Sequence, residues 1–225
     1  MIDERAALSI FKQLGALREN DHFVYASGYH GSTYVAKEML YVYPEITWVL
    51  CEEMKNLCGK GWEIDCVVGP EKGGMILSQW VGYLLAQSTG RQVTSVFAHK
   101  LVPPMGGNGF TFMQEYGNFI DGKNIFIVED IINTGGTVKN IVSLVCDWGG
   151  IVKAVGALWN RGNMTLQDMR LAPKSFALVN KSFPRWSEAE CPLCAAHFPI
   201  NTQFGRGKEF LARQTVQTPH QGSTF

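Results

Sequence analysis

The chain has 225 residues, with 20 basic and 20 acidic side chains, so its formal net charge is zero. That length suits one α/β domain with a small appended subdomain and is short for two full domains. A neutral chain gives no global reason to expect binding to nucleic acid or to an anionic membrane. Any anionic ligand must therefore be held by local geometry.

The composition also bears on the cellular compartment. No stretch of about 18 apolar residues occurs, so no transmembrane span is expected, and the first fifteen residues have the spacing of an amphipathic helix rather than of a signal peptide. Six cysteines are spread over a long chain, and four of them lie in apolar or helical runs. This usage favours a reduced, cytoplasmic protein over a disulfide-bonded secreted one.

The first half of the chain begins with an amphipathic segment and then alternates between strands and helices. Apolar residues recur at helical spacing from about Glu4 to Leu17, and Pro44 suits the first turn of a later helix. The expected elements are a helix over 4–17, extended pieces over 21–26 and 33–36, a helix over 44–57, a strand over 65–69, a helix over 75–88, and a strand over 92–98.

The second half continues the alternation after a glycine-rich stretch. Residues 101–119 contain four glycines and two prolines, which predicts a long loop or a flexible hairpin. The expected elements are then a strand over 124–129, a helix over 136–147, and strands over 151–159 and 174–179. Strands that alternate with helices in this way predict an α/β fold, in which a parallel sheet has helices on both faces.

The segment Ile125–Asn140, IFIVEDIINTGGTVKN, carries the clearest chemical signal. Four apolar residues predict a buried strand, and Glu129 and Asp130 follow at its carboxyl end, where open α/β sheets bind ligands. The next stretch is Asn133-Thr134-Gly135-Gly136-Thr137, and a helix follows it. Its backbone N–H groups and threonine hydroxyls can form a nest for a phosphate.

Two acids beside such a nest need a partner other than the phosphate, because they repel an anion. A sugar diol or a Mg²⁺ ion meets that need, which favours a ribose 5-phosphate as the ligand. A nucleoside triphosphate fits less well, since the chain lacks the GxxxxGK[ST] pattern. The alternative without a ligand is an ordinary strand-to-helix turn in which the acids form a solvated cap.

The run Val128–Thr137 resembles the diphosphoribosyl-binding signature of the type I phosphoribosyltransferases, in which a hydrophobic run is followed by two acids and a Thr/Gly-rich loop. The resemblance implies that fold, a parallel central sheet flanked by helices with a small hood subdomain. It also implies that Glu129 and Asp130 contact the ribose hydroxyls, and that Asn133–Thr137 surround the 5-phosphate.

Other stretches are similar to the orotate members of that family. The N-terminal stretch FVYASGYHGSTYVAKEML resembles their opening, with Ser27, Gly28, His30 and Tyr34 at the matching positions. An ordinary turn is the alternative for this stretch. By the resemblance, His30 would face the departing pyrophosphate.

Two further loops fit the same family. Residues Val67–Gly74 are similar to its pyrophosphate loop, in which Lys72 and Gly73 would bind the diphosphate. Arg161 ends a later strand, where orotate enzymes carry an Arg that touches the base, so its planar guanidinium would contact a pyrimidine-like acceptor. A surface arginine at a strand end is the alternative.

The chain departs from the family pattern after the strand over 92–98. His99 stands where the orotate enzymes carry an arginine, Lys100 keeps one charge, and the remaining cations of their mobile loop are missing. Lys100 is still expected to act in catalysis and His99 to bind substrate, because neutralising the leaving group is the main electrostatic task. The glycine-rich loop over 103–117 is expected to close over the site, with Phe110 and Phe112 as an apolar tip or a dimer contact.

Together these features predict a transferase that moves the 5-phosphoribosyl group from 5-phosphoribosyl 1-diphosphate to a pyrimidine base such as orotate and releases pyrophosphate. Mg²⁺ is expected between the diphosphate and the ribose hydroxyls, held indirectly by Glu129 and Asp130. The resemblance implies a homodimer, with neither nucleic acid nor a membrane as a partner. The alternatives are a non-catalytic or weakly active ribose-phosphate sensor of the same fold, and a transferase for a purine or another base.

The domain organisation and the last cysteines complete the predictions. We expect one domain over 1–225, with 1–40 and 160–205 forming the hood and 213–225 a flexible tail. Cys191 and Cys194 form a CxxC pair, and His197 lies three residues on. A structural zinc site, a redox pair and plain thiols all remain open, because a zinc site needs four ligands and no second CxxC exists.

Overall fold

A computed structural model of the chain describes residues 2–59, 61–102, 109–162 and 171–217. It divides the chain into two compact units, each built from two stretches of sequence. Unit 1 comprises Met1–Phe11 and Lys37–Ser182, and unit 2 comprises Lys12–Ala36 and Phe183–Phe225. The expected hood range 160–205 thus includes strand β8 (Lys174–Asn180), which lies in the sheet of unit 1.

Unit 1 is built on a six-stranded sheet in the order β5-β4-β3-β6-β7-β8. Its pairings are parallel except at the edge, where β5 runs antiparallel to β4. The other strands are β3 (Cys66–Pro70), β4 (Thr94–Lys100), β5 (Phe110–Thr111), β6 (Asn124–Ile132) and β7 (Ile151–Asn160). The predicted parallel sheet is therefore confirmed.

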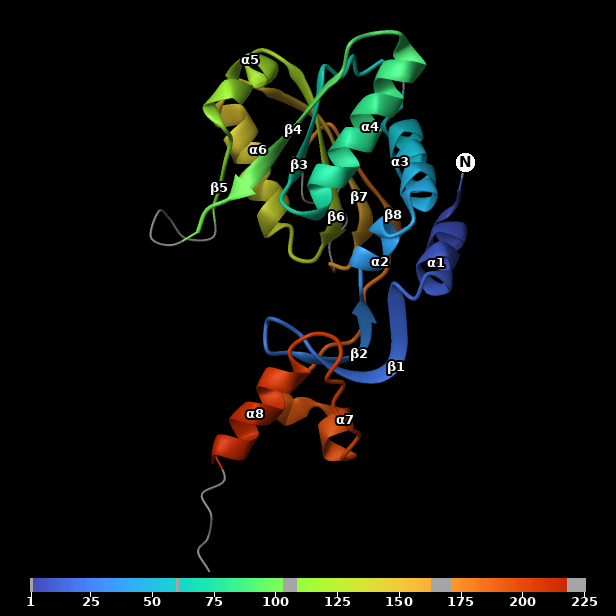
Figure 1. Ribbon diagram of the computed structural model, residues 1–225, viewed down its shortest axis with the longest axis vertical. Helices are drawn as coiled ribbons and strands as arrows, with labels where there is room; N and C mark the ends of the chain where they lie inside the picture. The colour runs from blue at the N-terminus through green and yellow to red at the C-terminus, as the bar shows by residue number, and fades with distance from the viewer. Residues whose placement is uncertain (1, 60, 103–108, 163–170, 218–225) are drawn as a thin grey trace, which may run out of the picture. The chain divides into compact units, whose positions relative to one another are not determined.

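Helices cover both faces of this sheet (Figure 1). The crossover from β3 to β4 runs through α4 (Gly73–Thr89), and the crossover from β6 to β7 runs through α6 (Gly136–Asp147) in the opposite direction along the sheet. Because parallel crossovers are right-handed, these two helices lie on opposite faces. The remaining helices of unit 1 are α1 (Glu4–Gln13, which ends in unit 2), α2 (Glu38–Tyr41), α3 (Pro44–Cys58), η1 (Gln114–Tyr116) and α5 (Gly117–Ile120).

Central strands of unit 1 are buried on both faces, as their apolar runs predict. The side chains of β6 from Ile125 to Asp130 are all buried, and Trp159 of β7 is fully buried against Phe11. Phe112 is also a core residue, 4% exposed and packed edge-on against Trp148. The expectation that Phe112 forms a lid tip or a dimer contact is therefore wrong; residues 103–108 of the expected lid lie outside the described residues.

The strand order creates a switch point between β3 and β6. From β3 the chain crosses to β4 on one side, and from β6 it crosses to β7 on the other side. Loops that leave two such strands diverge, and in open α/β sheets ligands bind in the crevice outside the carboxyl ends at this place. The loops that follow β3 and β6 are those that the sequence singles out as phosphate-binding.

Unit 2 contains an antiparallel pair, β1 (Leu17–Val24) and β2 (His30–Val35), together with η2 (Glu188–Glu190), α7 (Pro192–Ala195) and α8 (Gly207–Gln217). The predicted helix over 4–17 ends earlier than expected. Gly15 adopts a φ of +64°, which breaks the helix, and Leu17 pairs with Val35 as the start of β1.

The C-terminal region is more ordered than the fading sequence pattern suggested. Residues 213–217, assigned to a flexible tail, belong to α8, whereas residues 218–225 of that tail lie outside the described residues. Among the helices of the described residues, none is long and apolar enough to cross a membrane.

Candidate functional site

The acid pair lies at the carboxyl end of β6, as predicted. Glu129 is 6% exposed and Asp130 is 1% exposed. Gly135 then takes a φ of +78°, which lets the chain turn sharply into α6 at Gly136. The first amides of a helix have no partner within it, so this turn offers N–H donors beside the exposed side chains of Asn133, Thr134 and Thr137.

Asp130 is held by three groups of unit 1. The Lys37 ammonium lies 3.0 Å from Oδ1 and 2.9 Å from Oδ2, and the Tyr41 hydroxyl donates to Oδ2 at 3.3 Å. The backbone N–H of Ile131 donates to Oδ1 at 2.6 Å. A further hydroxyl can reach this carboxylate only if one of the side-chain partners moves.

The buried charges alter the protonation of the groups around them. Burial, and then the neighbouring Asp130, raise the pKa of Glu129 well above its ordinary value. Burial alone would lower the pKa of Lys37, but the carboxylate of Asp130 outweighs it and raises that pKa. Burial followed by Asp130 also raises the pKa of Tyr41. Lys37 and Tyr41 are therefore hydrogen-bond donors to Asp130 at any pH near neutrality.

The loop after β3 is packed tightly beside Asp130. A Cβ atom added to Gly73 would collide with Oδ2 of Asp130 and with the Tyr41 hydroxyl, and one added to Gly69 would collide with the Gly74 carbonyl. The chain can only make this close turn without side chains at these positions. The absence of a Cβ thus brings the predicted pyrophosphate loop and the acid pair together.

Glu71 ties this loop to the end of β4. Its backbone N–H donates to the Ala98 carbonyl at 3.0 Å, and its carboxylate accepts the Lys100 N–H at 3.0 Å. His99 Nδ1 lies 3.7 Å from the same carboxylate. The side chains of Lys72 and Lys100 are exposed, so both cations can meet an anion at this edge.

The loop after β7 lies against the loop after β6. The Arg161 N–H donates to the Ile132 carbonyl at 2.7 Å, and a Cβ added to Gly162 would meet the Asn133 carbonyl. Arg161 therefore follows a strand adjacent to the acid pair. The structure thus brings together, within unit 1, the predicted residues from the loops after β3, β4, β6 and β7.

His30 is not among them. It is fully buried in unit 2, where its Nδ1 lies 2.9 Å from Nε2 of His22 and 3.3 Å from Sγ of Cys194. Burial, and then the neighbouring His22, lower the pKa of His30, so its imidazole tends to be neutral. A buried neutral ring is poorly suited to meet pyrophosphate, and we do not retain His30 among the proposed substrate-binding residues.

The sequence reasoning missed Lys37 and Tyr41, which come directly after β2 and within α2. One signal was available. A buried pair of adjacent acids needs a cation nearby, and Lys37 is the basic residue of the stretch that resembles the orotate enzymes.

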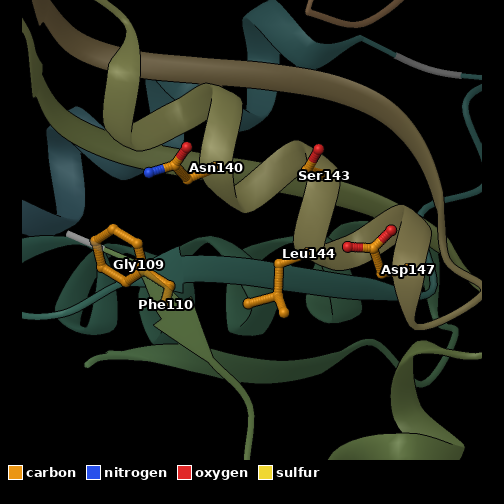
Figure 2. Close-up of a pocket in the computed structure, with 6 residues that line it drawn as sticks. All are labelled: Gly109, Phe110, Asn140, Ser143, Leu144 and Asp147. Carbon is orange, nitrogen blue, oxygen red and sulfur yellow. The ribbon is translucent and has the colours of Figure 1, made fainter. Parts of the chain in front are cut away.

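A separate hollow lies between α6 and β5. It has a volume of about 450 Å³ and is lined by Gly109, Phe110, Asn140, Ser143, Leu144 and Asp147. Figure 2 shows Asn140, Ser143, Leu144 and Asp147 along α6, with Phe110 across from them. Neither acid of the pair lines this hollow, so we do not assign the chemistry to it.

Comparison with known proteins agrees with this geometry. The model of the phosphoribosyl transferase domain matches residues 44–169, which span β3 to β7 and all the loops described above. The orotate phosphoribosyltransferase of Thermotoga maritima is 34% identical over 200 residues, which cover 88% of this chain and 97% of the relative. The enzyme of that name from Thermoanaerobacter sp. is 30% identical over 199 residues, which cover 88% and 96%.

Solved structures share the fold at lower identity. Orotate phosphoribosyltransferase of Mycobacterium tuberculosis superposes with a TM-score of 0.60 at 17% identity, covering 80% of this chain and 97% of that one. Adenine phosphoribosyltransferase of Thermoanaerobacter pseudethanolicus gives 0.54 at 19% identity, covering 77% and 99%. The fold alone therefore does not select the base. On its sequence, the chain belongs to the phosphoribosyltransferase family, among the relatives named orotate phosphoribosyltransferase.

Proposed function

We propose that this chain transfers the 5-phosphoribosyl group from 5-phosphoribosyl 1-diphosphate to orotate. A ring nitrogen of the base forms a bond to C1 of the ribose while the bond from C1 to the diphosphate oxygen breaks, and pyrophosphate leaves. The observation that carries the proposal is the packing of the loop after β3 against Asp130, at the switch point between β3 and β6.

The donor is held mainly by the segment after β6. In the proposal, the backbone amides and hydroxyls of Asn133, Thr134, Gly135, Gly136 and Thr137 bind the 5-phosphate. Glu129 and Asp130 receive the ribose hydroxyls beside it. This division follows charge, because the N-terminus of α6 attracts an anion and the two acids do not.

Asp130 reaches the ribose by exchanging partners. Its oxygens are occupied by Lys37, Tyr41 and the Ile131 amide, so a ribose hydroxyl must take the place of one side-chain donor. Lys37 and Tyr41 meanwhile keep Asp130 ionised and oriented. We regard both as positioning residues.

The leaving group meets the cations of the neighbouring loops. Lys72 and the backbone of Gly73 bind the diphosphate, and Lys100, with His99 beside it, stabilises the negative charge that builds up as pyrophosphate departs. Catalysis of this kind depends on positioning and charge, not on a covalent nucleophile.

Mg²⁺ belongs to the proposal as a companion of the diphosphate. The acid pair fits it chemically, since Mg²⁺ prefers oxygen ligands and is usually held by one or two carboxylates together with substrate phosphates. When bound, it would neutralise diphosphate charge. Glu129 and Asp130 would hold it indirectly, through the ribose hydroxyls.

The acceptor is proposed from Arg161 and from the named relatives. Arg161 follows β7, next to the loop that binds the donor, and orotate carries a carboxylate that a guanidinium binds in a bidentate manner. The proposal also includes a homodimer and a cytoplasmic setting, which rest on the family resemblance and on the cysteine usage.

The first test measures pyrophosphate release with Mg²⁺, 5-phosphoribosyl 1-diphosphate and a panel of orotate, uracil, adenine and hypoxanthine. Turnover with orotate supports the proposal. Turnover with a purine alone overturns the choice of acceptor. Binding of the donor without turnover on any base favours the ribose-phosphate sensor, which the missing cations after Lys100 make the second candidate.

The second test neutralises the acid pair in the double variant Glu129→Gln, Asp130→Asn. We expect turnover to fall by about 1,000-fold or more, because the ribose loses both anionic hydrogen-bond acceptors. The matched control is Glu115→Gln, Asp147→Asn, which changes the charge equally at exposed positions and should keep wild-type rates. Wild-type turnover in the first variant would contradict the proposed role of the pair.

A further inference from the structure

Four metal-binding side chains converge inside unit 2. They are His22 on β1, His30 at the start of β2, Cys191 directly after η2 and Cys194 in α7. One ligand atom from each lies within 4.8 Å of all the others, and three of the residues are buried, with Cys194 partly exposed. From this convergence we propose that unit 2 binds a structural zinc ion through His22, His30, Cys191 and Cys194.

The distances match tetrahedral coordination. His22 Nε2 lies 2.9 Å from His30 Nδ1, 3.5 Å from Cys191 Sγ and 3.7 Å from Cys194 Sγ, and Cys194 Sγ lies 3.3 Å from His30 Nδ1. With Zn–N bonds of about 2.0 Å and Zn–S bonds of about 2.3 Å, the ligand atoms of a tetrahedron are about 3.3 to 3.8 Å apart. The cluster needs only small adjustments to reach these values.

The surroundings of His22 fix its tautomer for this role. Its Nδ1 lies 2.9 Å from the carbonyl oxygen of Phe198. A carbonyl can only accept, so Nδ1 carries the proton and donates it. The lone pair of His22 is then on Nε2, the atom that faces the cluster, and a second-shell hydrogen bond of this kind is typical of zinc-bound histidines.

The choice of metal and its role follow from the ligand set. Two thiolates with two imidazoles suit Zn²⁺, whereas Mg²⁺ and Ca²⁺ prefer oxygen ligands. All four tetrahedral positions are filled by protein side chains, so no position remains for a substrate or a catalytic water. The proposed site is therefore structural, and it is independent of the ribose-phosphate chemistry proposed for unit 1.

The sequence suggested only half of this site. The CxxC pair pointed to zinc, but His197, which follows it closely, is exposed and lies outside the cluster. The other two ligands are about 160 residues away along the chain, and only the folding of unit 2 brings them to the cysteines.

Unit 2 has a physical need for such a cross-link. It has a short pair of strands and few large buried apolar side chains, and its two segments are separated by most of unit 1. Small units with modest cores are commonly stabilised by disulfides or by a structural metal. The proposed ion would join the β1–β2 pair to the segment that contains α7.

The test begins with the full chain purified without a metal-affinity tag. We expect elemental analysis to find about one zinc per chain. Replacement by Co²⁺ should give the visible absorption of tetrahedral cobalt and the near-ultraviolet charge-transfer bands of cobalt bound to thiolate. This measurement uses the wild-type chain, so it does not depend on whether any variant folds.

Variants then identify the ligands. Cys194→Ser and His22→Ala should each lower the bound zinc at least about fivefold, whereas the matched controls Cys146→Ser and His197→Ala, both at exposed positions, should retain it. A wild-type chain with neither zinc nor cobalt signature overturns the proposal. So does a Cys191–Cys194 disulfide in the freshly purified chain, or zinc that survives Cys194→Ser and is lost in His197→Ala.

Discussion

At the scale of single residues, Asp130 and Glu129 are neighbours with different environments. Asp130 has a cation, a phenol and an amide as partners, whereas Glu129 is buried and accepts the N–H of Asp130 at 2.9 Å. The same strand end therefore presents one carboxylate stabilised as an anion and one carboxyl group whose charge is disfavoured. Adjacent acids in such unlike environments can take different roles toward the ribose hydroxyls.

This difference predicts the pH dependence of the variant Glu129→Gln. The pKa of Glu129 is raised in the folded state, so between the unfolded and the folded pKa the folded chain binds more protons than the unfolded chain. The contribution of Glu129 to the free energy of unfolding is thus fully present below the unfolded pKa and is lost as the pH rises through the folded pKa. The amide loses nothing over this window.

We therefore expect Glu129→Gln to gain stability relative to the wild type as the pH rises from about 5 to about 8, by on the order of 1 kcal/mol. Urea unfolding at a series of pH values measures this difference. The exposed-site control, Glu115→Gln, should show a flat difference. A difference for Glu129→Gln that does not change with pH would contradict the raised pKa.

At the scale of elements, two strand-to-helix connections make the site, and each depends on glycine for a different reason. Gly135 supplies a left-handed turn, whereas Gly73 leaves room for the Asp130 carboxylate and the Tyr41 hydroxyl. The first requirement concerns the backbone angle, and the second concerns space.

The second requirement predicts the behaviour of Gly73→Ala. The added methyl group would collide with Asp130 and Tyr41, so the loop after β3 must shift. We expect the free energy of unfolding to fall by about 1–3 kcal/mol and the KM for 5-phosphoribosyl 1-diphosphate to rise by about tenfold or more. The matched control is Gly117→Ala, since a Cβ at Gly117 meets nothing within 4 Å; its stability should stay within about 0.5 kcal/mol of the wild type. Equal behaviour of the two variants would contradict the steric argument.

Elements of unit 1 could be predicted from the sequence because their signals are local. The helix Gly136–Asp147 has the predicted bounds, and β3, β6 and β7 differ from them by only a few residues, since apolar runs and glycine turns mark their ends. The roles of Lys37 and His30 could not be predicted. Each depends on a partner far away in the chain, Asp130 for the first and Cys194 for the second, and spacing along a sequence does not contain that information.

At the scale of the whole molecule, the chain divides its tasks between its two units. The proposed substrate-binding residues belong to unit 1, and the proposed zinc ligands belong to unit 2. The global charge balance is zero, so recognition of an anionic donor depends on local amides and lysines, as the composition indicated.

This division predicts a local response to metal removal. When a chelator strips the proposed zinc, we expect amide hydrogen exchange to speed up in β1 and β2 while β6 and β7 keep their protection, because stability is lost only where the cross-link acted. Cys194→Ser should reproduce this pattern without a chelator, and Cys146→Ser should not. Equal loss of protection in both units would mean that the metal stabilises the chain as a whole.

The order of the segments has a consequence for how the chain folds during synthesis. Unit 2 is discontinuous, since Lys12–Ala36 leaves the ribosome long before Phe183 and the residues that follow. Unit 1 can form its sheet while the β1–β2 segment still lacks its partners. Completion of unit 2 is thus a late event that requires contacts of very high sequence separation, and a bound metal ion would secure that final closure.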